Sequence, residues 1–307
     1  MEIVSLQSFS SLDSGLCATI GFFDGVHKGH LFLLNQLQEV ARKEQQRSMV
    51  ITFRNPPRAC LQAGFIPQLL TSTEEKLELI SQTGIDYCFL LDFTQEIANM
   101  TAGEFIRQIL SERLNVKNLL IGHDHRFGRG RNEGFEDYVN RGKTCGIEVI
   151  LAKELSSDVR INSTLIRNKI QNKAIEDANV LLGRPYSLKG KVIHGNQIGQ
   201  KIGFPTANLS VSEPYKIIPP EGIYAVYTSF DGRTYPGMAY IGKRPTVSKQ
   251  EEKRIEVHII DFSGDLYGKT ICLEFIKYLR DDQQFESLEE LQQQLTKDKG
   301  QILGILL

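Results

Sequence analysis

The stretch CATIGFFDGVHKGH, residues 17–30, joins an apolar run to a helix-forming segment through a turn rich in glycine. The run 16–21 is short and apolar, which predicts a buried strand, and residues 30–45 carry leucines at helical spacing. Between them stand three glycines, one aspartate and two histidines, His27 and His30. A hydrophobic core requires none of this polar chemistry, so the turn is a candidate ligand site.

The alternation of apolar strands and amphipathic helices continues to about residue 182. Strands are predicted over 49–53, 87–91, 118–122 and 148–151, and helices after Ser72, after Thr101 and over 163–182. Ser72 and Thr101 each stand three residues before a glutamate, which is the spacing of a capping box. Apolar strands separated by helices indicate an α/β fold, a doubly wound, Rossmann-like parallel sheet with helices on both faces.

The pattern changes beyond Pro185, which stops the preceding helix, and strands then dominate. Strand patterns cover 222–230, 233–242, 254–262 and 269–279. Asp231-Gly232, between the first two, is a strong hairpin signal, and Ser287 opens a final helix. The second part is therefore predicted to be a small antiparallel β-barrel with a C-terminal helix. We place the boundary near Gly183, which gives domains 1–183 and 184–307.

The composition is that of a globular protein of 307 residues, 41% hydrophobic and 24% charged, with a formal net charge of −1. This balance provides no global field that would attract nucleic acid or an anionic membrane, so we expect neither as a partner. Five scattered cysteines without a C-x-x-C pair favour reduced thiols. We find no signal peptide and no window of ~20 apolar residues, and we expect a cytoplasmic protein. The oligomeric state stays open.

The glycine-rich turn has the features of an anion site. In an open parallel sheet, ligands bind at the carboxyl ends of strands, and a helix N-terminus offers unpaired N–H groups to a phosphate. Gly21, Gly25 and Gly29 permit close approach of the backbone. His27 and His30 lie on one helical turn and can donate hydrogen bonds to charge that develops during phosphoryl or nucleotidyl transfer. The alternative is that both histidines are surface or capping residues.

GFFDGVHKGH resembles the H-x-G-H signature of the nucleotidyltransferase superfamily, which joins a nucleoside monophosphate to an acceptor phosphate and releases pyrophosphate. INSTLIR, residues 161–167, resembles the second signature, I-S-S-T-x-[IV]-R, with Asn162 in place of a serine. By itself INSTLIR fits an ordinary helix start equally well. The resemblance implies a catalytic role for His27 and His30. It also implies nucleotide contacts for Gly21, Phe22, Phe23, Asp24, Gly25, Gly29, Ser163, Thr164 and Arg167.

IGHDHRFGRGRNEG, residues 121–134, resembles the G-x-D-F-R-F-G motif of the bacterial flavin adenylyltransferases. The resemblance implies that Asp124, Arg126 and Arg160 contact flavin, and the alternative is a solvated basic loop. The T-F-x-P-H-P motif of the same branch is matched poorly by TFRNPPRA, residues 52–59, which lacks the histidine.

GKVIHGNQIGQKIGFPTANL, residues 190–209, opens the second domain with glycines at four-residue spacing. No G-K-[ST] ends it, so it is not a Walker loop; spaced glycines can cradle phosphates, but a glycine-rich hairpin turn is the alternative. GFPTAN, residues 203–208, resembles the P-T-A-N motif of riboflavin kinases. The resemblance implies that Thr206 and Asn208 hold Mg²⁺ with the ATP phosphates, since hard oxygen ligands suit magnesium. It also implies nucleotide contacts for Gly195, Lys201 and Gly203.

RIEVHIIDFSGDLYGK, residues 254–269, resembles the riboflavin kinase segment E-x-H-x-x-D-F…D-L-Y-G. The resemblance implies that Glu256 is the catalytic base for the ribityl 5′-hydroxyl. The alternation of apolar and polar residues equally fits an outward-facing Glu256 on a half-buried strand. YIGKRPTV carries Tyr240 where that family has asparagine, and LRDDQQF implies a flavin or nucleotide contact for Arg280.

In their order, these motifs span residues 20–297 and resemble the bacterial bifunctional riboflavin kinases and FMN adenylyltransferases. The resemblance implies Mg²⁺ with ATP, and riboflavin, FMN and FAD as substrate, intermediate and product. Three alternatives stay open: a chain with only one live activity, a flavin-binding regulator without turnover, and a nucleotidyltransferase acting on another phospho-alcohol.

Overall fold

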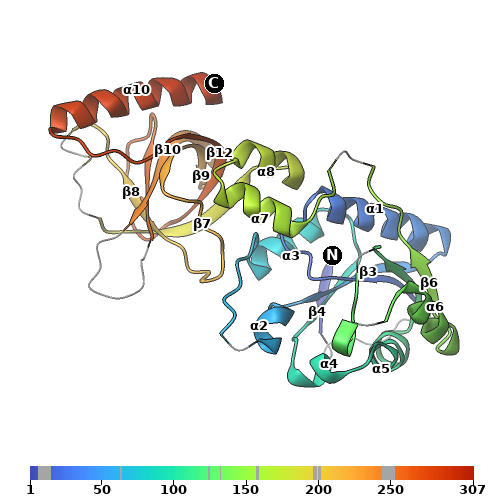
Figure 1. The fold of residues 1–307 in the computed structure, drawn as a ribbon. Coiled ribbons are helices and arrows are strands. Elements are labelled where there is room, and N and C mark those ends of the chain that lie inside the picture. Colours follow the sequence, from blue (N-terminus) through green and yellow to red (C-terminus); the bar gives the residue numbers. More distant parts are fainter. Residues whose placement is uncertain are drawn as a thin grey trace. The chain divides into compact units, whose positions relative to one another are not determined.

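The computed structural model describes residues 1–5, 15–62, 64–123, 125–131, 133–156, 159–195, 199, 202–243 and 253–307. Asp124 and Lys201, two residues implicated by the motifs, lie outside these ranges. The chain divides into two compact units, Met1–Ser163 and Thr164–Leu307, and each unit has its own sheet (Figure 1). The domain boundary that we place near Gly183 stays a prediction.

The first unit is a six-stranded parallel sheet in the order β1-β4-β3-β2-β5-β6, which confirms the predicted α/β class. Its strands are β1 (Glu2–Val4), β2 (Leu16–Ile20), β3 (Arg47–Phe53), β4 (Tyr87–Leu91), β5 (Val116–Ile121) and β6 (Glu148–Leu151). Its helices are α1 (Lys28–Lys43), α2 (Pro57–Leu61), α3 (Thr73–Ser81), α4 (Gln95–Asn99), α5 (Ala102–Glu104), η1 (Phe105–Arg113), η2 (Arg129–Arg131) and α6 (Phe135–Thr144). We did not predict β1, because three residues are too few to show a period.

Strand β2 occupies the point where the strand order reverses. The chain adds β3 and β4 on one side of β2, and later β5 and β6 on the other. Ligands of open parallel sheets bind outside the carboxyl ends of the strands at such a switch point. The glycine-rich turn that follows β2 and leads into α1 therefore lies where a ligand is expected.

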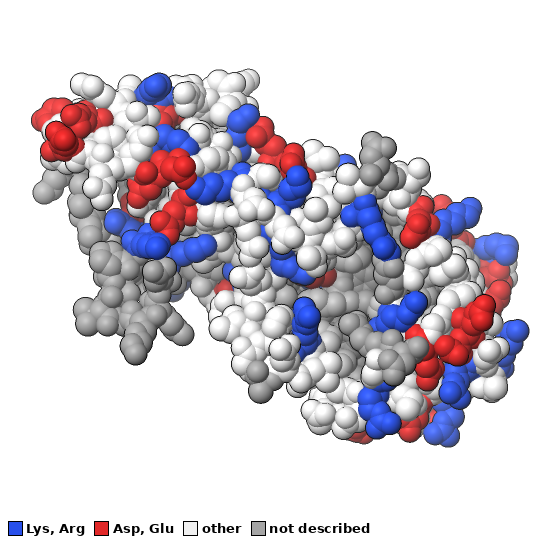
Figure 2. Space-filling view, viewed as in Figure 1, with Lys and Arg blue, Asp and Glu red and all other residues white. Residues whose placement is uncertain are grey.

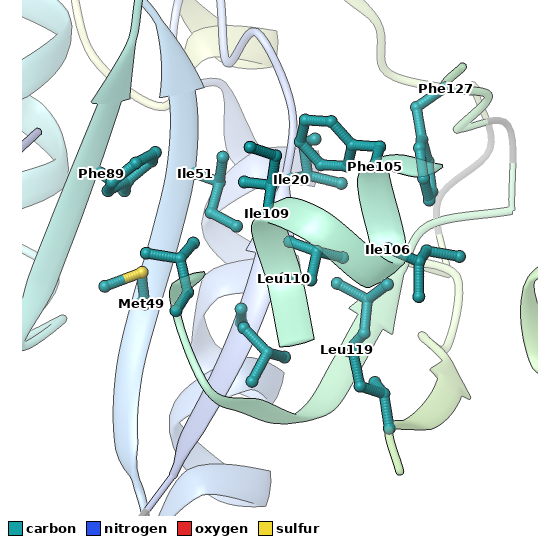
Figure 3. Packing of buried hydrophobic residues seen from close by; sticks show 14 of the residues in the cluster. Ile20, Met49, Ile51, Phe89, Phe105, Ile106, Ile109, Leu110, Leu119 and Phe127 are labelled. Atoms are coloured by element: carbon teal, nitrogen blue, oxygen red, sulfur yellow. The ribbon is translucent and has the colours of Figure 1, made fainter. Parts of the chain in front are cut away.

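Helices cover both faces of this sheet: α1 lies on one side and α4 and α5 on the other (Figure 1). Ile20 and Ile51 on the strands pack against Ile106 and Leu110 of the π-helical segment η1 (Figure 3). Val50 belongs to the cluster on the opposite face, with the buried side of α1. Because both faces of the sheet are buried, its strands are nearly continuous apolar runs in the sequence.

The second unit is a closed antiparallel barrel in the order β10-β11-β8-β7-β12-β9, which confirms the predicted barrel. Its strands are β7 (Tyr186–Ile193), β8 (Ala207–Ser210), β9 (Gly222–Phe230), β10 (Arg233–Lys243), β11 (Lys253–Ile259) and β12 (Thr270–Arg280). Its helices are α7 (Ser163–Gln171), α8 (Ile175–Leu182) and α10 (Leu288–Leu306). Asp231 and Gly232 have φ of 49° and 73°, the left-handed pair that a tight β9–β10 hairpin requires.

Glu176 and Asn179 of α8 both bind the helix to the barrel, Glu176 through an ion pair with Lys277. The Asn179 amide donates to the Phe275 carbonyl at 2.8 Å, and its oxygen accepts from the Tyr186 N–H at 2.8 Å. At its C-terminus α8 ends on Gly183, whose φ of 79° is typical of a helix stop. The helix thus packs on β7 and β12 although we assigned it, from sequence, to the first domain.

The C-terminal helix α10 is held by a buried ion pair. Asp298 is 0% exposed and accepts from Arg280 Nε at 3.1 Å and from Arg280 Nη2 at 2.7 Å. Gln294, one turn earlier on α10, donates to the same carboxylate at 2.8 Å. Every acceptor site of this buried charge therefore faces a donor from β12 or α10.

Asp298→Ala is expected to destabilise the second unit by about 3–5 kcal/mol, because it leaves the largely buried Arg280 guanidinium without its anionic partner. The free energy of unfolding, from urea titrations followed by circular dichroism, measures the loss. Glu176→Ala is the matched control, since it removes one partner of the exposed Glu176–Lys277 pair and should cost less than about 1 kcal/mol. Equal losses in the two variants would contradict the structural role of Asp298.

The surface matches the composition. Basic and acidic side chains both occur across the viewed face (Figure 2), and the formal net charge is −1. Within the described ranges, no helix combines the length and the apolarity that crossing a membrane requires. All five cysteines fall within those ranges and are free thiols.

Candidate functional site

The turn after β2 has a strained backbone that the core holds in place. Phe23 and Val26 have φ of 54° and 36°, a region that non-glycine residues rarely occupy, and Gly25 between them has φ of 82°. Such conformations cost on the order of 1–3 kcal/mol each and cluster at functional sites. The Phe23 and Val26 side chains are buried in the cluster beneath α1, and this burial offsets the strain.

Asp24 supports the turn from within. Its Oδ1 accepts hydrogen bonds from the Leu70 and Thr71 N–H groups at 2.8 and 3.2 Å. The Thr71 hydroxyl in turn accepts from the Gly25 N–H at 3.0 Å. We expected Asp24 among the nucleotide contacts, and that role stays a prediction; the structure shows a buried carboxylate that fixes the turn against the segment before α3. The Ser163 hydroxyl donates to the Asp24 carbonyl at 2.9 Å, which joins the two signature motifs.

The two histidines stack on each other at the N-terminus of α1. Their ring centroids are 3.6 Å apart and their planes are inclined by 16°. His27 is 4% exposed and caps the helix, because its Nδ1 accepts from the His30 N–H at 3.3 Å. A neutral His27 ring that accepts at Nδ1 carries its proton on Nε2. The capping alternative therefore holds for His27, and it sets the tautomer of this imidazole.

His30 carries a ring nitrogen whose hydrogen-bonding capacity is not met. Nδ1 of His30 is buried and has no hydrogen-bond partner among the described residues. Burial, and then the nearby His27 and Lys76, lower the pKa of His30 well below its ordinary value. Buried polar atoms in native proteins are rarely left without a partner. A neutral imidazole with a buried, unpaired nitrogen at a helix N-terminus is therefore a site that a polar ligand would complete.

Gly29 keeps the space beside the histidines open. A Cβ at this position would lie 3.3 Å from the His27 ring and 3.6 Å from the Ile161 carbonyl. A side chain here would therefore crowd the capping imidazole, whereas its contact with the Ile161 carbonyl would be an ordinary van der Waals contact. Gly21 is restricted in the same way, since its Cβ would lie 2.9 Å from the Phe23 ring.

We missed one charged residue of this site in the sequence. Lys76 on α3 is 2% exposed, and its Nζ donates to the Phe53 carbonyl at 2.7 Å and to the Phe22 carbonyl at 3.2 Å. Burial lowers the pKa of Lys76 to about 8. The signal that could have revealed it is its spacing, because Lys76 precedes the apolar residues Leu79 and Ile80 by three and four positions and so shares their helix face.

The structure describes some, but not all, of the remaining residues that we predict to contact flavin or nucleotide in the first site. Arg126 Nη1 donates to the His125 carbonyl at 3.1 Å, within its own loop, and Arg160 is exposed. Arg167 Nη2 donates to the Thr164 hydroxyl at 3.2 Å, one turn along α7 in the second unit. Asp124 lies outside the described residues. A flavin or nucleotide role for these residues stays a prediction.

In the barrel, three residues of the candidate kinase site stand side by side on neighbouring strands. Glu256 on β11 is paired in register with Asn208 on β8 and with Tyr240 on β10. The Thr206 hydroxyl donates to Glu256 Oε2 at 3.2 Å, and Arg254 forms an ion pair with the same carboxylate. The structure therefore brings Thr206, Asn208 and Glu256 together, as the motifs implied.

Glu256 is only 9% exposed, which rules out a simple outward-facing position on a half-buried strand. The P-T-A-N segment covers this part of β11: His258 Nδ1 lies 2.8 Å from the Pro205 carbonyl, and its ring packs edge-on against Phe204 at 5.1 Å. Gln292 of α10 donates to the Ile202 carbonyl at 3.1 Å and so anchors the start of the segment.

Gly195 and Gly203 of the barrel loop are glycines for different structural reasons. A Cβ on Gly195 would lie 2.1 Å from the Asn208 amide nitrogen, so any side chain there would displace the Asn208 side chain. Gly203 is exposed and has φ of 82°, a conformation that favours glycine. Lys201, the third nucleotide contact that we predicted in this loop, lies outside the described residues.

Arg280 and Tyr240 are both engaged by carboxylates. The Arg280 guanidinium contacts Asp298, and its Nη1 donates to the Asp281 carbonyl at 2.9 Å, so protein acceptors already engage it. A flavin or nucleotide contact of Arg280 stays a prediction. The Tyr240 hydroxyl donates to Asp282 at 2.9 Å, and burial together with this bond raises the pKa of Tyr240 to about 12.

The oxygen atoms beside Glu256 fit a hard cation. Thr206 offers a hydroxyl and Asn208 an amide oxygen, and Mg²⁺ prefers such oxygen ligands, completing its shell with water and substrate phosphates. No group of three or more histidine, cysteine or acidic side chains in the described part of the chain could form a protein-only metal cage.

In a comparison with known protein families, two family models match separate parts of the chain. The family model described as FAD synthetase matches residues 10–165, and the one described as riboflavin kinase matches residues 182–306. A crystal structure of a macrolide-efflux protein from Streptococcus pneumoniae has the same fold, with a TM-score of 0.90 and 31% identity over 98% of both chains.

Curated relatives match over nearly the whole length. The bifunctional riboflavin kinase/FMN adenylyltransferase of Escherichia coli K12 is 38% identical over 93% of this chain and 91% of its own. The protein of the same name from Bacillus subtilis is 35% identical over 92% of this chain and 90% of its own. The chain therefore belongs to the family of bifunctional riboflavin kinase/FMN adenylyltransferases.

Proposed function

We propose that the chain phosphorylates riboflavin to FMN with ATP and then adenylylates FMN with a second ATP, giving FAD and pyrophosphate. The observation that carries the proposal is that each of the two family regions contains its own polar cluster: stacked histidines at a helix N-terminus in the first, and Thr206, Asn208 and Glu256 in the second. Residues 1–183 are proposed to carry the adenylylation and residues 184–307 the kinase reaction.

In the adenylylation step, an oxygen of the FMN phosphate attacks the α-phosphorus of ATP. The bond from that phosphorus to the β-phosphate oxygen breaks, and pyrophosphate leaves. The FMN phosphate is already ionised at neutral pH, so the protein has to position it and neutralise charge rather than activate it. The N–H groups of α1 face the phosphates, while His27 and His30 hydrogen-bond their oxygens. Ser163 holds the second signature beside the turn through the Asp24 carbonyl.

In the kinase step, Glu256 accepts the proton of the riboflavin 5′-hydroxyl. The hydroxyl oxygen attacks the γ-phosphorus of ATP, and the bond to the leaving ADP oxygen breaks. Thr206 and Arg254 fix the orientation of the Glu256 carboxylate. Thr206 and Asn208 would hold Mg²⁺, which when bound with ATP neutralises phosphate charge.

We also propose that the protein works in the cytoplasm on small-molecule substrates, namely flavins and ATP. The five free cysteines support a reducing compartment. Near-neutral net charge and mixed surface charges support the absence of a nucleic-acid partner.

The decisive experiment is incubation of the purified chain with riboflavin, ATP and Mg²⁺, followed by chromatographic separation of the flavins. We expect FMN first and FAD later, both suppressed by a chelator. A parallel incubation with FMN in place of riboflavin isolates the second step. Accumulation of FMN without FAD would indicate one live activity, and flavin binding without ATP consumption would indicate a regulator; either result contradicts the proposal.

A further inference from the structure

Lys76 occupies a position that is unfavourable for a lysine in two respects. It is 2% exposed, and taking an ammonium group out of water is costly. It also lies at the fourth residue of α3 (Thr73–Ser81), where the positive end of the helix dipole repels a cation. Natural sequences violate such local preferences mainly at functional sites, so the location requires a reason beyond stability.

The contacts of Lys76 link it to the carboxyl edge of the sheet. Its Nζ donates to the carbonyl of Phe53, the last residue of β3, and to the carbonyl of Phe22, two residues beyond β2. The same ammonium lies 4.4 Å from the centre of the Phe22 ring. The Thr52 hydroxyl also donates to the Phe22 carbonyl, at 3.2 Å. Phe22 belongs to the turn that carries the two histidines, so Lys76 fixes the entrance of that turn.

Titratable groups of the turn and of neighbouring elements act on both His30 and Lys76. The titratable groups that act on His30 are His27 at the start of α1 and Lys76 on α3. Those that act on Lys76 are Asp24 in the turn and the Cys88 thiol of β4. Burial raises the pKa of Cys88 to about 12, so this thiol is uncharged at neutral pH. The positive charge of Lys76 is thus one of the charges that act on His30.

We propose that Lys76 is a positioning residue of the adenylylation site: its ammonium holds the Phe22 carbonyl, two residues beyond β2, and the Phe53 carbonyl at the end of β3, and so fixes the turn that carries His30, while its charge acts on the His30 imidazole. This inference rests on the proposed FMN adenylylation. Lys76 acts through the turn and through His30 rather than by contact with the reacting atoms.

The test compares Lys76→Met, which removes the charge and the donors, with Lys43→Met, a matched control at a side chain that is 81% exposed. FAD formation from FMN and ATP is measured as kcat and KM, and FMN formation from riboflavin in the same chain reports on the second unit. We expect kcat for FAD formation to fall at least about tenfold in the Lys76 variant, with kinase activity unchanged, because a misplaced site costs rate rather than affinity.

The second readout is the titration of His30, followed by NMR of the histidine ring protons and assigned with a His30 variant among the six histidines of the chain. The positive charge of Lys76 disfavours imidazolium, so its removal should raise the pKa of His30, whereas Lys43→Met should leave it unchanged. Lys76→Gln repeats the measurement with N–H donors retained, so that an uncharged, folded variant is available if the methionine variant unfolds.

Three results would overturn the proposal: an unchanged His30 pKa in both uncharged variants, an unchanged kcat for FAD formation, or equal losses in both activities. These failures are distinct from failure of the proposed function itself. If the wild-type chain forms no FAD from FMN and ATP, the adenylylation assignment fails. If the wild type and Lys76→Met form FAD equally well, only the role of Lys76 fails.

Discussion

His30→Ala is expected to reduce the rate of FAD formation from FMN and ATP by about 10²–10³-fold, the usual cost of deleting one donor that stabilises developing charge. The variant removes the buried Nδ1, which has no partner among the residues that the structure describes, and one ring of the stacked pair. It leaves the helix cap in place, because the cap uses the His30 backbone N–H and the His27 side chain. The loss should therefore be chemical rather than structural.

The measurement is the initial rate of FAD production with saturating FMN and ATP. Conversion of riboflavin to FMN by the same variant serves as an internal control, because the candidate kinase site lies in the second unit. Near-normal FAD output from His30→Ala would show that the histidine turn is not the adenylylation site.

Glu256→Gln is expected to lower kcat of the riboflavin kinase reaction by about 10²–10⁴-fold, the range for loss of a general base. Glutamine has nearly the same volume, and its amide oxygen can still accept from the Thr206 hydroxyl. It cannot take up the proton of the 5′-hydroxyl. FMN adenylylation, which we propose for residues 1–183, should be unchanged.

FMN formation and FAD formation are measured separately, with riboflavin and with FMN as the starting flavin. Because the substitution leaves Arg254 without its anionic partner, thermal unfolding is followed alongside activity. Glu289→Gln on the exposed side of α10 gives the background effect of the same chemical change. A folded Glu256→Gln variant with full kinase turnover would remove Glu256 from the role of base.

Several features of the fold could be predicted because their causes are local. The capping box of Ser72 and Glu75 forms as expected, with bonds of 3.1 and 2.9 Å. The Asp231-Gly232 hairpin forms because both residues tolerate the left-handed backbone that the turn requires. Whether a segment forms a strand or a helix follows from the spacing of its apolar residues. This spacing spans only a few residues and can be seen in a single sequence.

The candidate sites could be predicted only in part. The histidine turn is recognisable because its glycines and histidines are contiguous in the chain. The sequence predicts that Asp24 in the same turn contacts nucleotide. It does not predict that its carboxylate accepts a hydrogen bond from the N–H of Leu70, 46 residues away. The sequence likewise predicts a flavin or nucleotide contact for Arg280, but it does not predict the ion pair of its guanidinium with Asp298 on α10. In both cases the partner comes from a segment that no local pattern connects to the motif.

By itself, the sequence determined the five consecutive strands β2 to β6, the change from a parallel sheet to a barrel, and the motifs from which both reactions are inferred. The tertiary structure alone decided which polar groups are buried and which partners they have: Lys76 lies beneath the histidine turn, Glu256 lies under the P-T-A-N segment, and Nδ1 of His30 has no partner in the described part of the chain. The physical reason is that backbone conformation depends on neighbours along the chain. Burial, and with it pKa and hydrogen-bond satisfaction, depends on segments that meet only when the chain folds.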